Sequence, residues 1–134
     1  MSKDWVDDIY KMHKHYGVHE VVETFDDVML AKLLEFRYKF LEEEMTELLE
    51  ADTADEAVDA LIDLCVVAIG TLDAMDVDIE MAWDKVLKAN MSKKVGVKQS
   101  RPNPLGLPDL VKPEGWEAPS HKNNVGLFGR VYKE

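Results

Sequence analysis

The stretch EAVDALIDLCVVAIGTLDAM, residues 56–75, is apolar on almost every side of a helix, yet its first half carries acids. Asp59 and Asp63 are one helical turn apart, and Glu56 precedes Asp59 by three residues, so one face of the helix holds all three. Carboxylates are rarely buried unless a partner offsets their charge. The stretch therefore predicts a buried helix with an acidic site near its start.

Three other segments space their apolar residues as helices do, and they cover roughly residues 3–16, 26–50 and 79–90. The segment 26–50 contains no proline or glycine and should form the longest helix. Gly17 is a suitable stop for the first helix, and Thr53 or Asp55 can cap the helix that starts near Glu56. Four helices of this kind predict an all-α, four-helix bundle-like fold.

The composition changes after residue 94. All 5 prolines and 5 of the 7 glycines lie beyond Val95, and no long periodic segment follows. Trp116, Leu127 and Phe128 are large apolar residues that a disordered tail would leave in water. We therefore predict a helical domain over residues 1–94 and an irregular tail over 95–134 that packs on the bundle or on a neighbouring subunit.

The net negative charge of the chain limits the kinds of molecule that it can bind. The chain of 134 residues has 27 acidic and 16 basic residues and a formal charge of -11, which disfavours nucleic acids and anionic membranes. Its single cysteine, Cys65, excludes an internal disulfide and fits a buried thiol in a reducing compartment. The N-terminus lacks a signal-peptide run, and Asp63 interrupts the longest apolar run, which is too short to span a bilayer. These features predict a cytoplasmic protein, in the host cytoplasm if it is viral.

On a helical wheel of residues 26–50, acids again fall on the apolar side that should face the interior. Glu44 and Glu47 fall inside the apolar arc, as does Arg37, while Glu43 lies on its border. The arc itself consists of Leu30, Leu34, Leu41, Met45 and Leu48, widened by Leu33, Phe36 and Phe40.

The two acid-bearing helices should pair as an antiparallel hairpin because the linker around Thr53 is short. Reflection about Thr53 sets Glu47 opposite Asp59, Glu43 and Glu44 opposite Asp63, and Glu50 opposite Glu56. Four or five carboxylates then converge in a partly apolar cleft, where burial and mutual repulsion are costly unless a cation offsets them. An oxygen-only ligand set suits Mg²⁺ or Mn²⁺, and two or more ions fit this number of acids.

The acidic residues and the histidines have other interpretations. The run LEEEMTELLE, residues 41–50, taken alone is more typical of a solvated helix face. A di-iron carboxylate centre requires Glu-x-x-His, and no glutamate in the sequence has a histidine three residues later. We expect His13, His15 and His19 to be surface residues, with a site role as the alternative, and His121 has no assigned role.

The segments EEEMTELLE, EAVDALIDLCVVAIGT and AWDKVLKANMSKK resemble the all-α nucleoside triphosphate pyrophosphohydrolases of the MazG-like superfamily, especially its small phage and bacterial members. The resemblance covers roughly residues 36–94. The family pattern is ExxE on one helix and ExxD on the next, with a further glutamate before the first pair. Its matches here are Glu44 and Glu47, then Glu56 and Asp59, with Glu43 as the further glutamate. The gap between the pairs is shorter than usual for the family, so Asp63, which the hairpin geometry favours, is an alternative to Glu56.

The resemblance implies hydrolysis of a nucleoside triphosphate between its α and β phosphates, giving the monophosphate and pyrophosphate. The predicted metal ligands are Glu44, Glu47, Asp59 and either Asp63 or Glu56, with Glu43 as the general base. The predicted substrate contacts are Arg37, Asn90, Lys93 and Lys94. As alternatives, Arg37 supports the acids and Asn90 simply ends its helix, and each lysine taken alone is more typical of a solvated charge. Trp83 is more typical of a core residue than of a base-stacking one.

The biological role is predicted by analogy with members of the superfamily. Small phage-like members point to control of the nucleotide pool, including removal of dGTP in phages that replace adenine. A non-catalytic acidic module, or a regulator that binds nucleotides without cleaving them, is the alternative. The helix at residues 56–75 has more apolar surface than three partner helices can cover, so we predict a homo-oligomer, a tetramer or a dimer, with sites near subunit boundaries. The alternative is a monomer whose tail folds back on the bundle.

Overall fold

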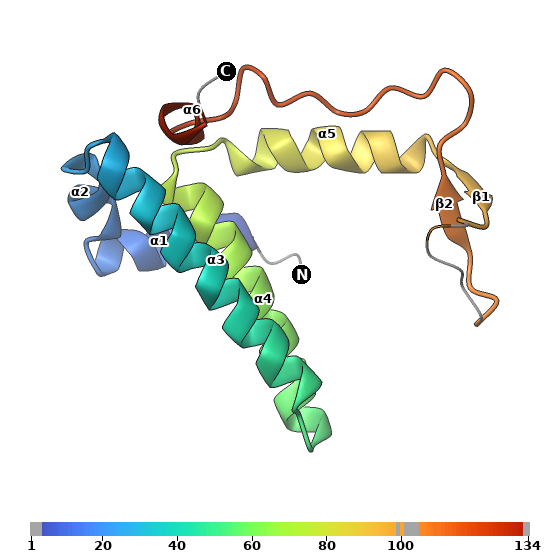
Figure 1. Ribbon diagram of the computed structural model, residues 1–134, viewed down its shortest axis with the longest axis horizontal. Helices are drawn as coiled ribbons and strands as arrows, with labels where there is room; N and C mark the ends of the chain where they lie inside the picture. Colours follow the sequence, from blue (N-terminus) through green and yellow to red (C-terminus); the bar gives the residue numbers. More distant parts are fainter. Residues whose placement is uncertain (1–3, 99, 101–104, 133–134) are drawn as a thin grey trace. The chain divides into compact units, whose positions relative to one another are not determined.

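The computed structural model describes residues 4–98, 100 and 105–132, and in this part of the chain the fold is all-α, as predicted (Figure 1). Its helices are α1 (Trp5–His15), α2 (Val18–Glu23), α3 (Asp27–Leu49), α4 (Ala54–Ala74), α5 (Ile79–Met91) and α6 (Phe128–Val131). Two short strands, β1 (Lys94–Gly96) and β2 (Asp109–Val111), pair antiparallel with Val95 opposite Leu110. None of the helices in the described residues has the length and apolarity needed to cross a membrane.

Three helices begin at side-chain caps. Asp4, Asp26 and Thr53 each accept a hydrogen bond from the backbone N–H three residues later, at 2.9, 2.9 and 3.1 Å. Such caps satisfy N–H groups that the first helical turn leaves without partners. Gly17, with φ of 75°, separates α1 from α2 in the left-handed conformation that glycine adopts without strain. Thr53 is therefore the cap of α4, one of the two residues that the sequence offered.

The helices α3 and α4 form a hairpin and lie side by side in Figure 1. Leu30 of α3 and Met75, at the end of α4, are fully buried together with Val22 of α2. The C-terminal residues close this core: Leu127 and Phe128 pack against it. The Leu127 N–H donates to the Met75 carbonyl over 2.6 Å. A side chain at Gly126 would overlap that same carbonyl, so the approach requires glycine there.

The predicted apolar arc of α3 is correct in part. Leu30 is buried and most other members of the arc are half-buried, but Phe36 and Met45 are 63% and 61% exposed. Their place in the arc predicted an interior position, which is wrong for these two residues. The helix carries apolar residues on more than one side, and α4 covers only one of them.

The chain forms two compact units, Met1–Ile79 with Asn124–Glu134, and Glu80–Asn123. The first contains the α3–α4 hairpin together with α1, α2 and α6. In the second, the Trp116 indole N–H lies within 2.9 Å of both the Ala89 carbonyl and the Ser92 hydroxyl, linking the tail to the end of α5. The division into a domain over residues 1–94 and a tail over 95–134 stays a prediction.

Candidate functional site

Three carboxylates meet between α3 and α4. Glu44 and Glu47, one turn apart on α3, and Asp63 of α4 each offer an oxygen, and these oxygens lie within 4.8 Å of one another. We call these three residues the acidic cluster. The short turn after α3 makes the helices antiparallel, so acids near the end of α3 meet acids near the start of α4, as the reflection about Thr53 predicts. A set of carboxylate oxygens at this spacing could hold a divalent ion.

The acidic cluster is electrostatically strained. Glu44 is only 7% exposed, and its Oε2 has no hydrogen-bond partner among the described residues. Burial raises the pKa of Glu44 above its usual range, and the negative charges of Glu47, Asp63 and Glu43 raise it further. Burial also raises the pKa of Asp63, followed by the charges of Asp59 and Glu47. A side-chain hydrogen bond with Glu47 contributes to the shift of Glu44, and in both residues neighbouring negative charges add to the effect of burial.

Two further predicted acids border the acidic cluster. Glu43 and Asp59 are both exposed, and each acts electrostatically on a member of the cluster: Glu43 on Glu44 and Asp59 on Asp63. The hairpin thus brings together five of the six acids that the sequence singled out. Their roles as ligands and base stay predictions.

Glu56 lies elsewhere. Its carboxylate accepts a hydrogen bond from the Asp52 N–H over 3.1 Å, while its own N–H donates to the Thr53 hydroxyl. This pair of bonds resembles a capping box at the start of α4. Glu56 therefore has a local structural partner and is outside the group formed by Glu44, Glu47 and Asp63, which favours Asp63 as the alternative ligand.

The predicted substrate contacts are spread over the chain. Arg37 lies two turns before Glu44 on α3 and sits beside Gly70 and His13; a Cβ on Gly70 would be 3.4 Å from its Nη1. Desolvation lowers the pKa of Arg37, and the charge of Asp73 opposes that shift. Asn90, Lys93 and Lys94 belong to the second unit, where the Lys93 ammonium lies 5.1 Å from the centre of the Trp116 ring. Their contact with substrate stays a prediction.

Two expectations about single residues were wrong. Trp83 is 66% exposed rather than part of the core. Cys65, expected to be buried, is only half-buried. The base-stacking role of Trp83 is therefore sterically open and stays a prediction.

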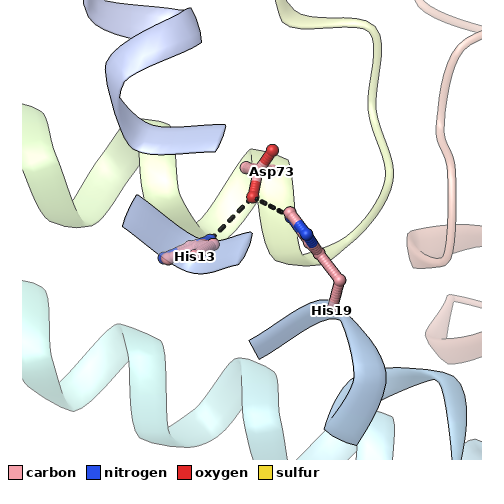
Figure 2. A group of neighbouring side chains, drawn as sticks. All are labelled: His13, His19 and Asp73. Carbon is pink, nitrogen blue, oxygen red and sulfur yellow. Dashed lines mark hydrogen bonds and ion pairs between the residues drawn. The ribbon is translucent and has the colours of Figure 1, made fainter. Parts of the chain in front are cut away.

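A second group of titratable side chains, which we call the histidine cluster, lies near the other end of α4. His13 Nδ1 and His19 Nε2 each lie 2.7 Å from the same oxygen, Oδ2 of Asp73 (Figure 2). His13 was expected at the surface but is only 4% exposed, and His19 is half-buried. The expectation failed because these residues lie 54 and 60 positions from Asp73, a pairing that only the packing of α1 and α2 on α4 creates.

One signal in the sequence could have drawn attention to Asp73. It is an acid in the last turn of an apolar helix, where the helix dipole disfavours negative charge. An acid retained in such a place requires donors or cations nearby. In the structure the two imidazoles supply the donors, and the positive charge of Arg37 acts on the carboxylate.

Comparison with protein families matches residues 17–90, more than half of the chain, to phosphoribosyl-ATP pyrophosphohydrolase. The chain belongs to this family. The phosphoribosyl-ATP pyrophosphohydrolase family lies in the MazG-like superfamily of all-α nucleoside triphosphate pyrophosphohydrolases, which confirms the resemblance seen in the sequence. The matched residues contain the whole α3–α4 hairpin and therefore the acidic cluster. No curated protein matches the chain.

Membership of this family identifies the protein as a pyrophosphohydrolase in general terms. The acidic cluster is a candidate site for the divalent ion on which members of the family typically depend. The match also includes His19 and Asp73, whereas His13 lies before its first residue.

Proposed function

We propose that the protein is a metal-dependent nucleoside triphosphate pyrophosphohydrolase that converts a (d)NTP and water into the (d)NMP and pyrophosphate. The observation that supports this most strongly is Glu44, a buried carboxylate whose Oε2 lacks a hydrogen-bond partner among the described residues while other acids surround it. Such an arrangement is costly without a cation and suited to holding one. It occurs in the hairpin of a chain that belongs to a pyrophosphohydrolase family.

The proposed metal is Mg²⁺ or Mn²⁺. Oxygen-only donors are the ligands that these hard ions prefer, and the acidic cluster offers them without a nitrogen or sulfur atom among them. In this proposal Glu44, Glu47, Asp59 and Asp63 hold the ion. Once bound, it would neutralise phosphate oxygens and lower the pKa of a coordinated water.

The other acid and the cations have different proposed tasks. Glu43, exposed at the border of the cluster, accepts a proton from the attacking water; the new bond forms at the α-phosphorus, and pyrophosphate leaves with the bridging oxygen. Arg37 has a buried Nε without a hydrogen-bond partner among the described residues, which suits either a phosphate oxygen or support of the site. Asn90, Lys93 and Lys94 are further proposed substrate contacts.

The base and sugar of the substrate define two candidates. A canonical or deoxy nucleoside triphosphate is the first, with dGTP in a phage as its most specific form. The description of the family to which the chain belongs names phosphoribosyl-ATP as the substrate. This molecule carries the same α–β phosphoanhydride and is therefore the second candidate. A hydrolysis panel should include the four ribonucleotides, the four deoxynucleotides and phosphoribosyl-ATP, each with Mg²⁺ and with Mn²⁺. We expect pyrophosphate from at least one nucleoside triphosphate; turnover of phosphoribosyl-ATP alone would assign the second candidate.

The panel also tests the non-catalytic alternatives. A regulator that binds nucleotides would show nucleotide-dependent thermal stabilisation without product. An acidic module for a basic partner would show neither. Absence of pyrophosphate in every reaction would therefore reject the enzyme proposal, and thermal stabilisation would then separate the other two.

We further propose that the protein is a homo-oligomer, a tetramer or a dimer, that acts in the cytoplasm. The α3–α4 hairpin leaves large apolar side chains exposed: Phe36, Met45, Leu49, Val58, Leu61 and Ile62. Leu49 is 86% exposed, and large apolar side chains left exposed in such number are typical of a chain that forms subunit contacts. Light scattering tests this proposal, since a mass near the chain's 15.3 kDa would reject it.

A further inference from the structure

We propose that the histidine cluster, His13, His19 and Asp73, is a second metal site, selective for a borderline transition-metal ion such as Zn²⁺ rather than for Mg²⁺. Its three ligand atoms lie within 4.8 Å of one another and come from α1, α2 and α4. The site uses no residue of the acidic cluster, so this inference does not depend on the proposed function.

The orientation of the three side chains is the main support for a metal site. Figure 2 shows Asp73 reaching from α4 to a point between the two imidazole rings, and each ring turns one nitrogen toward the same oxygen. Two histidine nitrogens and one carboxylate oxygen form a three-ligand set of the kind found at zinc sites that keep a position for water or another ligand. Oxygen-only sites select Mg²⁺ and Mn²⁺, whereas imidazole nitrogens favour Zn²⁺, Co²⁺ and Ni²⁺.

Metal binding requires a small, balanced rearrangement. A carboxylate only accepts hydrogen bonds, so in the metal-free chain both imidazoles donate an N–H to Asp73. When the metal takes those two nitrogens, the ring N–H of His13 must be on Nε2 and that of His19 on Nδ1, the tautomers that leave the ligand nitrogens free. Ligand atoms around tetrahedral Zn²⁺ are about 3.3 Å apart, so the 2.7 Å contacts must open by roughly 0.6 Å.

His19 is the residue that can make this movement. Its side chain is 26% exposed and stands on α2, a helix of only six residues that begins after Gly17. His13 and Asp73 are held on longer helices, and their side chains are 5% and 9% exposed. The ligand on the shortest of the three helices is therefore also the most exposed one, an arrangement that lets an ion enter from the side of α2.

Arg37 is the competing cation. A Cβ on Gly70 would lie 3.4 Å from Arg37 Nη1 and 3.3 Å from His13 Nε2, so the guanidinium is near the ring edge that faces away from Asp73. The proposed ion enters at the opposite edge, at Nδ1. The positive charge of Arg37 lowers the affinity for the ion without occupying the ligand positions.

Zinc binding to the intact chain tests the proposal, with excess Mg²⁺ present to occupy oxygen-only sites. We expect one high-affinity Zn²⁺ per chain, and zinc X-ray absorption from the wild-type protein should show two imidazole ligands. His19→Ala should weaken this binding by more than the about 10- to 100-fold that loss of an outer-shell partner costs. His15→Ala is the matched control, because His15 is an exposed histidine of α1 outside the cluster.

Each other outcome overturns the proposal. No Zn²⁺ binding by the wild type would leave the cluster as a hydrogen-bonded contact only. Binding that survives His19→Ala and Asp73→Asn but is lost in Glu47→Gln would put the zinc in the acidic cluster. If His19→Ala does not fold, the wild-type absorption spectrum still decides, since a spectrum without imidazole scattering contradicts the site.

Discussion

The acidic cluster and the histidine cluster are about 15 Å apart along α4. They differ in the groups that surround their buried carboxylates. In the acidic cluster, Glu44 is surrounded by groups of its own sign, and its Oε2 has no hydrogen-bond partner among the described residues. In the histidine cluster, Asp73 receives two imidazole hydrogen bonds and feels the positive charge of Arg37. In the metal-free chain, the acids of the first cluster repel one another, whereas the acid of the second is hydrogen-bonded by its own neighbours.

The difference gives the two clusters opposite effects on the stability of the metal-free chain. A site that is strained when empty gains free energy when an ion arrives, and removal of one of its acids relieves repulsion. A site that is satisfied when empty contributes to the packing of α1 and α2 on α4, and removal of its central acid leaves donors without acceptors. The following predictions test this contrast.

The largest effect is expected on hydrolysis. Glu47→Gln and Asp59→Asn should each reduce pyrophosphate release about a hundredfold or more, because each removes a charge from a proposed metal ligand. The fold should remain intact by circular dichroism. Glu42→Gln, which alters an exposed glutamate of the same helix, is the control and should retain the wild-type rate. Wild-type rates in the first two variants would reject the site.

A smaller difference separates the two alternative ligands. Asp63→Asn should cost far more activity than Glu56→Gln, since Asp63 lies with Glu44 and Glu47 while Glu56 accepts a hydrogen bond from Asp52. Glu56→Gln keeps an acceptor oxygen and should change the unfolding free energy by less than about 1 kcal/mol. Steady-state rates of the two variants decide; the reverse order would favour the usual family spacing.

Removing an acid from each cluster should change the free energy of unfolding in opposite directions. Asp73→Ala leaves the buried imidazole of His13 and the half-buried imidazole of His19 without their acceptor and should lower the free energy of unfolding by about 1–3 kcal/mol. Glu44→Gln in metal-free protein removes a repelled charge and should raise it. Urea unfolding in a chelating buffer measures both. Destabilisation by Glu44→Gln would show that the charges of the acidic cluster are already balanced.

The smallest effect is the pH dependence of metal-free stability. The pKa values of Glu44 and Asp63 are raised in the folded chain, so the folded state binds more protons than the unfolded state. Their contribution is fully favourable below their ordinary pKa values and is lost as pH rises through the raised ones. Mild acidification, or addition of Mg²⁺ at neutral pH, should therefore raise the melting temperature. Indifference to both would mean that the acids are solvated and separate.

Much of this arrangement was predictable because it depends on local periodicity. Helical spacing predicted α1, α3, α4 and α5, and the short turn at Thr53 was enough to predict that Glu44 and Asp63 would meet. Thr53 itself was foreseen as a cap. These features are encoded within a few residues or across a single tight connection.

The rest depends on packing that no local pattern reports. The helices α2 and α6 have six and four residues, too few to display a full apolar period. The contact of His13 with Asp73 spans 60 positions. Met45 was placed in the interior because a wheel cannot tell which of two apolar sides a partner helix covers.

The most direct test of the central claim is hydrolysis of nucleoside triphosphates in water labelled with heavy oxygen, by wild-type protein and Glu47→Gln with Mg²⁺. We predict that the wild type releases unlabelled pyrophosphate and a monophosphate that carries the label, since water attacks the α-phosphorus. Glu47→Gln should release neither at a comparable rate. The label in pyrophosphate or in inorganic phosphate, or equal rates from the two proteins, would contradict α–β hydrolysis at the acidic cluster.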